Sequence, residues 1–346
     1  MRYTREAKPK MKRQQKISYL KYFKLKEQPF ATTPDPKYLY LSEIHEEALD
    51  RLVTAISMRN GVNAIIGEPG LGKSLLVRTM LSGFRDTVRF AWVFNTTLNS
   101  RELVKYVCRD FGFTPGSDDM SDILIELYTF LIRQHEQGQI AILIIDEAQN
   151  LKPDVLEEIR QMSNLETVNK KLLQIILSGQ PQLDVHLEHP SLHQLKQRIS
   201  LKAVLERFDL EDTRKYILHR LWIAGGKRRD LFTEASFAAV HEISKGIPRL
   251  INQVCDNALL AAYQQKLDQV NSTLVTELLE KGIVTPAGPP PRLTRPRQEA
   301  YSRFESELRI DKATSPFTGR NGSRNGKSLA GVETFDGLDF GRLTIY

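Results

Sequence analysis

The stretch GEPGLGKS has the residue types and the spacing of a phosphate-binding loop. It matches the pattern G-x-x-x-x-G-K-S/T, and its residues are Gly67, Glu68, Pro69, Gly70, Leu71, Gly72, Lys73 and Ser74. Glycines let the backbone wind tightly around phosphate oxygens, and the N–H groups that open the next helix point at the anion. Lys73 would reach the β- and γ-phosphates, and the Ser74 hydroxyl would bind Mg²⁺. The stretch therefore predicts a site for ATP and Mg²⁺.

The flanking sequence favours this interpretation over an ordinary glycine-rich turn. The apolar run Asn63–Ile66 precedes the loop, and the helical pattern SLLVRTML follows it. This is the strand–loop–helix setting that a phosphate loop requires.

Two acidic residues, Asp146 and Glu147, follow the apolar run IAILII directly. Strands of a parallel sheet deliver their C-terminal ends to the ligand crevice. Asp146 would hold Mg²⁺ through water, and Glu147 would polarise the water that attacks the γ-phosphate. The alternative is a pair of acids that simply follows a buried strand, and the phosphate loop upstream makes that alternative weaker.

The order of the motifs favours ATP hydrolysis over a simple kinase reaction. Glu147 follows Asp146 directly, and a further strand, Val88–Phe94, lies between the two motifs along the chain. The later run LLQIILSGQ ends in Ser178 and Gln180, either of which would sense the γ-phosphate. A turn without any nucleotide role is the alternative for these two residues.

The elements that must position these residues alternate between strand-like and helix-like patterns, which predicts an α/β fold with a parallel sheet covered by helices. Helices follow one another after Glu211, which predicts a small helical domain over 210–285. The expected strands are Asn63–Ile66, Val88–Phe94, Ile140–Ile145 and Leu173–Ser178, with a fifth in Leu201–Leu205, and the clearest helices are Ser100–Phe111, Asp119–Gln137 and Pro153–Met162.

The net charge of +7 is concentrated in the two ends of the 346-residue chain. Residues 1–28 carry +8, residues 286–346 carry +3, and the middle carries −4. We expect residues 1–17 to form a flexible basic arm, and the Pro-, Gly- and Arg-rich segment 286–346 to be mostly disordered.

The remaining composition indicates a cytoplasmic protein. No apolar run approaches the roughly 18 residues that a membrane-spanning helix needs, and the N-terminus lacks the pattern of a signal peptide. Cys108 and Cys255 lie far apart without a metal or redox spacing, so we expect buried thiols.

Beyond these motifs the chain resembles the AAA+ ATPases of the ExeA/GspA type, which are associated with bacterial secretion and pilus assembly. The resemblance covers about 18–283 and is carried by the phosphate loop, LIIDEAQNL, MSNLETVNKKLLQIILSGQPQL, LKQRIS and KGIPRLINQVCDNALLAAY. It implies a P-loop AAA+ αβα sandwich over 18–209, followed by a helical lid domain over 210–285.

The resemblance also implies roles for residues outside the two acidic and phosphate-binding motifs. Arg198 in LKQRIS would be an arginine finger that reaches the γ-phosphate of a neighbouring subunit, so the active site would form only in an oligomer. A surface charge is the alternative, and Lys196 is a weaker candidate for the finger. Arg249 in GIPRLIN would be a second sensor that faces the phosphates from the lid.

The N-terminal segment PFATTPDPKYLY would pack against the nucleotide base, with Pro29, Phe30 and Tyr38 as the candidates. Packing in the core explains these residues equally well. The segment NLETVNKK, 164–171, is a candidate pore-facing loop of the oligomer.

The implied partners are other copies of the chain, in a ring or filament, and proteins of secretion or pilus assembly. Full-length secretion members continue into a membrane helix and a peptidoglycan-binding segment. The polar tail of this chain instead fits shorter relatives connected with pili. We expect a location in the cytoplasm or at the cytoplasmic side of the inner membrane. The alternative is an ATP-dependent regulator of transposition similar to TniB, TnsC and MuB, which assembles on double-stranded DNA and recruits a transposase. The basic arm 1–17 would then neutralise DNA phosphates.

Overall fold

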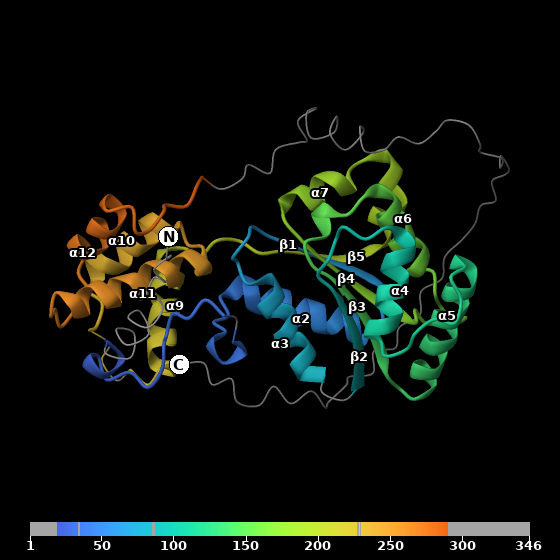
Figure 1. Ribbon diagram of the computed structural model, residues 1–346, viewed down its shortest axis with the longest axis horizontal. Helices are drawn as coiled ribbons and strands as arrows, with labels where there is room; N and C mark the ends of the chain where they lie inside the picture. Colours follow the sequence, from blue (N-terminus) through green and yellow to red (C-terminus); the bar gives the residue numbers. More distant parts are fainter. Residues whose placement is uncertain (1–18, 34, 85–86, 227, 229, 290–346) are drawn as a thin grey trace, which may run out of the picture.

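Residues 19–289 of the chain, apart from residues 34, 85–86, 227 and 229, are described by a computed structural model (Figure 1). The predicted basic arm 1–17 and the predicted disordered tail beyond residue 289 lie outside these residues.

The described elements alternate between strands and helices up to β5 and are helical after it (Figure 1). The strands are β1 Val62–Ile66, β2 Val88–Val93, β3 Ile140–Ile145, β4 Leu173–Gly179 and β5 Ile199–Val204. The helices of this first part are η1 Pro36–Tyr38, α2 Glu43–Ser57, α3 Lys73–Phe84, α4 Ser100–Asp110, α5 Met120–Glu136, η3 Ala148–Asn150, α6 Pro153–Met162, α7 Pro181–Leu187, η4 Pro190–Leu192 and α8 His193–Arg198. The later helices are α9 Leu210–Ile223, α10 Glu234–Ser244, α11 Pro248–Gln264 and α12 Ser272–Glu280.

The strands and helices expected from periodicity are all present. Each of the five strands agrees with its expected range to within two residues at either end, and α6 has the predicted bounds. Buried runs of β-branched residues and amphipathic stretches were therefore sufficient to locate the elements.

Local sequence signals explain several helix ends. Asn99 and Glu102 form a capping box at the start of α4, in which each side chain accepts a hydrogen bond from the backbone N–H of the other residue. Pro153 and Pro248 open α6 and α11, where the fixed φ of proline suits a helix and its missing N–H is not needed. Lys245 ends α10 with a left-handed φ of 48°.

The five strands form one parallel sheet in the order β2-β3-β4-β1-β5. β4 lies between β1 and β3, although it follows both of them in the sequence. The phosphate loop follows β1, and the two acidic residues follow β3. The polar residues at the end of β4 therefore lie between the two motifs.

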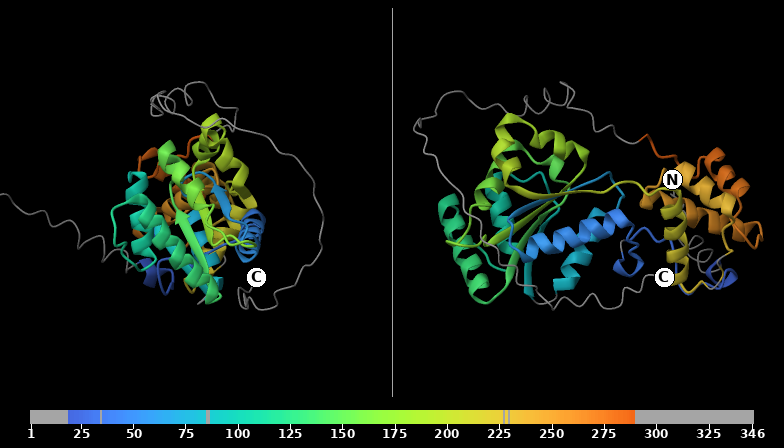
Figure 2. Two further views of the ribbon diagram at one scale, coloured as in Figure 1. Left: turned by 90° about the vertical axis from the view of Figure 1, so that its right-hand side faces the viewer. Right: turned by 180° about the vertical axis from the view of Figure 1, so that it is seen from behind.

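Helices cover both faces of this sheet (Figures 1 and 2). Alternate residues of a strand point to opposite faces. In β3, Ala141, Leu143 and Ile145 pack in the cluster that α4, α5 and α6 cover, whereas Ile142 and Ile144 pack in the cluster under α2 and α3. The domain is thus an αβα sandwich.

A third apolar cluster holds α9, α10, α11 and α12 together at the other end of the molecule (Figure 1). Tyr19, Phe23, Phe30 and Tyr38 belong to this cluster, so the N-terminal segment packs beside the later helices. α9 begins at the residue where the sequence placed the start of the lid, and the division of the chain into domains stays a prediction.

Gly246 allows the linker before α9 to pass directly beside the turn between α10 and α11. Its φ is +76°, and a Cβ at this position would lie 1.9 Å from the Phe208 carbonyl oxygen. Cys108 and Cys255 are buried free thiols, as predicted. Across the described ranges, no helix has the length and apolar character needed to cross a membrane.

Candidate active site

The phosphate loop joins β1 to α3 and holds the Lys73 side chain inside it. The Lys73 ammonium donates to the carbonyl oxygens of Gly67 at 2.7 Å and Glu68 at 3.1 Å, and only 6% of the residue is exposed. Gly70 and Gly72 have φ values of +88° and +98°, which glycine adopts without strain. Burial lowers the pKa of Lys73, although nearby carboxylates oppose this shift. The loop therefore presents a poorly solvated cation suited to a polyphosphate.

Asp146 accepts hydrogen bonds from hydroxyl groups on two neighbouring elements. The Ser74 hydroxyl donates to its Oδ2 at 2.7 Å, and the Ser178 hydroxyl donates to its Oδ1 at 2.8 Å. The start of α3 and the ends of β3 and β4 thus meet at one carboxylate. The sequence predicts Ser178 as a sensor of the γ-phosphate. In the structure its hydroxyl group is hydrogen-bonded to Asp146, the predicted metal ligand.

The oxygen groups of Ser74 and Asp146 fit a Mg²⁺ site, because Mg²⁺ binds one or two protein oxygens and completes its octahedron with water and phosphate. Among the described residues, no group of three or more His, Cys, Asp or Glu would hold a metal alone. The donor set therefore suits a metal that arrives with the nucleotide.

Glu147 has an unusual backbone and two amide partners. Its φ of 52° and ψ of 39° are left-handed, which is uncommon for a residue with a side chain. The side-chain amide of Gln149 donates to Glu147 Oε2 at 2.6 Å, and that of Gln180 donates to the same oxygen at 3.0 Å. Gln180 was predicted to belong to the site, whereas Gln149 was not. The sequence signal that could have identified Gln149 is its position in DEAQN, two residues after Glu147.

Arg207 is a second residue that the sequence reasoning missed. Its guanidinium donates to both carboxylate oxygens of Glu68, and it also donates to the Gly288 carbonyl oxygen at 3.0 Å. Glu68 belongs to the phosphate loop, and Arg207 lies in the linker between β5 and α9. No sequence signal relates the two, because 139 residues separate them.

Arg249 lies beside the phosphate loop, at the start of α11. Its N–H donates to the Gly70 carbonyl oxygen at 3.3 Å, and a Cβ on Gly70 would lie 2.8 Å from Arg249 Cβ. The Arg249 side chain is exposed. The first turn of α11 therefore touches the loop, which suits the predicted second sensor; that role stays a prediction.

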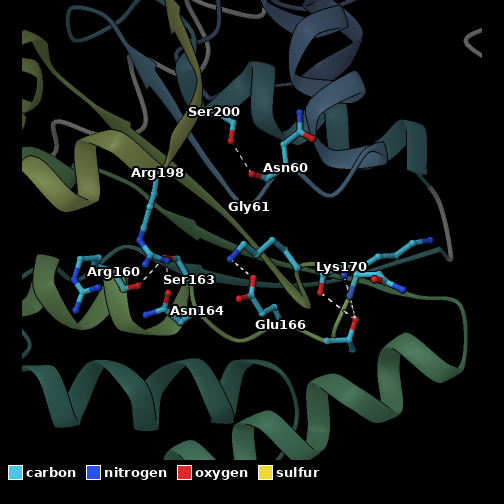
Figure 3. Close-up of polar contacts among 12 residues, drawn as sticks. Asn60, Gly61, Arg160, Ser163, Asn164, Glu166, Lys170, Arg198 and Ser200 are labelled. Atoms are coloured by element: carbon cyan, nitrogen blue, oxygen red, sulfur yellow. Dashed lines mark hydrogen bonds and ion pairs between the residues drawn. The ribbon is translucent and has the colours of Figure 1, made fainter. Parts of the chain in front are cut away.

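Arg198 lies away from these residues, at the end of α8 (Figure 3). Its guanidinium donates to the Ser163 hydroxyl at 3.2 Å and to the side-chain oxygen of Asn164, both at the end of α6. Lys196, the weaker candidate for the finger, pairs instead with Glu188 at 2.6 Å. Arg198 and the groups on Asp146 are not brought together within one chain.

The predicted pore-facing segment 164–171 forms a short hairpin after α6 (Figure 3). Glu166 and Lys171 make an antiparallel bridge and an ion pair at its base. Val168 at its tip is 99% exposed. The segment therefore projects an apolar tip from the same side of the molecule as Arg198.

The aromatic candidates for base packing lie in the helical core. Phe30 is 1% exposed and packs edge to face on Phe232. The Pro29 carbonyl oxygen accepts a hydrogen bond from Arg220, whose guanidinium stacks 4.5 Å from the centre of the Tyr38 ring. These contacts fit the core-packing alternative, and a contact with the base stays a prediction.

Residues 56–187 match a protein family described as AAA domain. General secretion pathway protein A of Aeromonas hydrophila is 39% identical to this chain over 246 residues, which are 71% of this chain and 45% of that protein. The chain thus spans less than half the length of this curated relative.

Several solved structures resemble the fold. The ORC2 protein of Aeropyrum pernix, solved as ADPNP and ADP complexes, has a TM-score of 0.57 at 17% identity, covering 74% of this chain and 71% of that chain. Drosophila ORC bound to DNA has a TM-score of 0.57 at 16% identity, covering 82% of this chain and 70% of that chain. At these identities the likeness concerns the fold alone, and it confirms the predicted α/β architecture.

Proposed function

This chain is an AAA+ protein of the ExeA/GspA type, and we propose that it binds and hydrolyses ATP as an oligomer whose active sites lie between neighbouring copies. The observation that supports an active site shared between copies is the position of Arg198 relative to the phosphate loop.

Arg198 and the phosphate loop lie at opposite ends of the sheet. Arg198 immediately precedes β5, whose first residue pairs with Val62 at the start of β1, whereas the loop follows Ile66 at the end of β1. Strands rise by about 3.3 Å per residue, so the two sites are separated by roughly 15–20 Å of strand. This separation exceeds the reach of an arginine side chain, so the proposed finger would act on the nucleotide of a second copy.

Within one copy, the arrangement of the remaining groups supports phosphoryl transfer to water. Lys73 and the loop N–H groups would bind the β- and γ-phosphates, and Ser74 and Asp146 would hold Mg²⁺. Mg²⁺, when bound, neutralises charge on the phosphate oxygens. Glu147 would accept a proton from the attacking water, whose oxygen bonds to the γ-phosphorus as the bond to ADP breaks. Arg198 of a neighbouring copy would stabilise the charge that develops.

Mixing two inactive variants tests the shared site. Arg198→Ala keeps its own Glu147 and lacks the finger, whereas Glu147→Gln keeps the finger and lacks the base. Each variant alone should lose ATPase activity, and the mixture should regain a measurable part of it. Lys196→Ala is the matched control and should retain activity, because its ammonium pairs with Glu188. A mixture as inactive as its components would contradict the shared site.

The proposed pathway is secretion or pilus assembly, and the similarity to general secretion pathway protein A supports it. The protein would then act in the cytoplasm or at the inner face of the inner membrane, with proteins of the secretion or pilus apparatus as partners. One observation favours the alternative of a DNA-binding regulator of transposition, which is the charge of +8 on residues 1–28.

DNA binding separates the two pathways. Binding to double-stranded DNA would be measured with ATP, with ADP and without nucleotide, over a series of salt concentrations and with residues 1–17 removed. ATP-dependent binding that weakens with salt and needs the arm would favour the transposition role. Absence of binding, with ATPase activity intact, would favour the secretion or pilus role.

A further inference from the structure

We propose that Gln149 is a positioning residue that fixes the Glu147 carboxylate and ties it to the end of β4. This inference rests on the proposed function, because it concerns the group that would take the proton from water. It assigns a role to a residue that neither the phosphate loop nor the acidic pair includes.

The two ends of the Gln149 amide make different contacts. Its Oε1 accepts a hydrogen bond from the backbone N–H of Gln180 at 2.9 Å, and its Nε2 donates to Glu147 Oε2 at 2.6 Å. A backbone N–H can only donate a hydrogen bond, so the side-chain oxygen of Gln149, and not its NH₂ group, must face Gln180. The NH₂ group must then face Glu147. The orientation of Gln149 is therefore set by the fold.

The surroundings leave Gln149 little freedom to move. The residue is 9% exposed, and its Oε1 would lie 3.2 Å from a Cβ on Gly179. The absence of a side chain on Gly179 thus lets the amide approach the end of β4 closely. A buried amide with both ends hydrogen-bonded holds its partners firmly, because either broken bond would leave a buried polar group unsatisfied.

The pattern at Glu147 leaves one oxygen for chemistry. Gln149 and Gln180 both donate to Oε2, and within the described part of the chain no group donates to Oε1. Two donors on one oxygen restrict the rotation of the carboxylate. Glu147 also adopts a left-handed backbone, which is strained for a residue with a side chain and needs support from its surroundings. Gln149 supplies part of that support.

The same amide links two predicted functions. Gln180 follows β4, where it was predicted to sense the γ-phosphate, and its backbone N–H holds Gln149. A displacement of this turn would therefore move Gln149, and through it the carboxylate of Glu147. Gln149 would couple the sensing segment to the base.

Two substitutions separate the two ends of the amide. Gln149→Glu keeps an oxygen for the Gln180 N–H but replaces the donor to Glu147 with a second carboxylate. Gln149→Leu removes both contacts. In the full-length chain, we expect kcat for ATP hydrolysis to fall about tenfold or more in both variants, with KM changed less than about twofold, because a general base acts only when it is positioned. Gln161→Leu, an exposed position on α6, is the matched control and should behave as the parent.

The pH profile provides a readout that a purely structural role would not change. Two carboxylates within hydrogen-bond distance share a proton and raise the upper pKa of the pair. The kcat of Gln149→Glu should fall as pH rises through an ionisation above the ordinary range of a glutamate. The pH dependence of kcat should therefore differ between Gln149→Glu and Gln149→Leu, because only the former adds a carboxylate. Parental kcat in both Gln149 variants, or a loss confined to ATP affinity, would overturn the inference.

Failure of the proposed function is distinguishable from failure of this inference. A parent chain without ATPase activity would contradict the proposed function alone. The contact itself is then tested by the melting temperatures of Gln149→Leu, Glu147→Ala and the double variant. Non-additive shifts would support the contact, and additive shifts would overturn it.

Discussion

The guanidinium of Arg207 and the carboxylate of Glu68 form a two-pronged pair, with donor–acceptor distances of 2.7 and 2.6 Å. Both side chains are mostly buried, with 13% and 17% of their surface exposed. A third hydrogen bond joins Arg207 to the Gly288 carbonyl oxygen, beyond α12. The pair thus joins the phosphate loop to the linker between β5 and α9 and to the segment that follows α12.

Replacing Arg207 should weaken ATP binding, because Glu68 would stay charged and unpaired beside the bound phosphates. In Arg207→Ala we expect the Kd for ATP to rise about tenfold, which corresponds to about 1.4 kcal/mol. Removing the carboxylate charge as well, in Arg207→Ala with Glu68→Gln, should restore much of the affinity. Titration of each variant with a fluorescent ATP analogue measures this.

Arg214→Ala is the matched control for that experiment. Arg214 pairs with Glu234 through two nitrogens in the same manner, but on the exposed surface of the helical part. Exposed pairs contribute little, so ATP affinity should stay at the parental value. Equal affinities in the parent and in Arg207→Ala would rule out an electrostatic role for the Glu68 pair.

A side chain at Gly70 should separate α11 from the phosphate loop. Its φ is +88°, and an added Cβ would lie 2.8 Å from Arg249 Cβ. Gly70→Ala should therefore both strain the backbone and displace the first turn of α11, which lowers the free energy of unfolding by about 1–3 kcal/mol. ATP affinity should fall as well. Thermal unfolding and nucleotide titration would measure the two effects.

Gly138→Ala separates backbone strain from steric contact. Gly138 has a similar φ of +76°, but no atom lies within 4 Å of an added Cβ. This variant should lose stability through backbone strain and retain the parental ATP affinity. If Gly70→Ala were no more harmful than Gly138→Ala, the close approach of α11 would have no importance for the nucleotide site.

Removal of the Ser178 hydroxyl should weaken Mg²⁺ binding and so raise the Mg²⁺ concentration that the reaction requires. Ser178 is 1% exposed and donates to Asp146 Oδ1, so its loss frees one side of that carboxylate. A hydrogen bond of this kind contributes about 1 kcal/mol, and hydrogen bonds to charged groups contribute more. In Ser178→Ala we expect the Mg²⁺ concentration for half-maximal ATPase activity to rise several-fold.

Ser236→Ala is the control for the loss of a buried hydroxyl. Ser236 is fully buried in the helical part and donates to the Thr233 carbonyl oxygen at 2.7 Å. Its substitution should change stability without changing the Mg²⁺ requirement. A parental Mg²⁺ requirement in Ser178→Ala would show that Asp146 needs no partner from β4.

Nucleotide binding should take up a proton at alkaline pH through Lys73. Burial lowers the pKa of Lys73 from its ordinary value of 10.5, whereas bound phosphates would favour the charged form and raise that pKa. ATP affinity should therefore be constant at lower pH and fall as pH rises through the lowered pKa of the unliganded protein. Calorimetry in buffers of different ionisation enthalpy would measure the proton uptake.

The stability of the unliganded protein should change in the opposite direction over the same pH range. Between the lowered pKa and 10.5, folded Lys73 binds fewer protons than Lys73 in the unfolded chain, so the free energy of unfolding rises with pH. Removal of the titrating group, in Lys73→Met, should abolish this contribution. Binding without any proton uptake across the alkaline range would contradict the buried position of Lys73.

The sequence determined the parts of this protein whose signals are local. Glycine, lysine and serine at fixed spacing located the phosphate loop, and a buried run before Asp146 and Glu147 located the second motif. The five strands followed from short apolar runs, and the later helices followed from a period of 3.6 residues. These signals are local because turn geometry, helix caps and one-sided burial depend on near neighbours in the chain.

The tertiary structure decided which ends of these elements meet. The insertion of β4 between β1 and β3 brings Ser178 to Asp146 and Gln180 to Glu147. Strand order is a property of long-range pairing and cannot be derived from the periodicity of any single strand. The sequence supplied most of the candidate residues, and the order of the sheet determined which of them contact one another.

The contacts that the sequence did not predict are between residues that lie far apart in the chain and are brought together by the packing of the elements. Arg207 meets Glu68 only because the linker after β5 returns to the phosphate loop, and Gln149 meets Gln180 only because η3 lies against the end of β4. Phe30 is apolar, so its type suited a nucleotide base and a helical core equally well, and the fold placed it in the core. Residue type restricts the chemistry that a side chain can perform, whereas the chain path determines which groups come within reach of it.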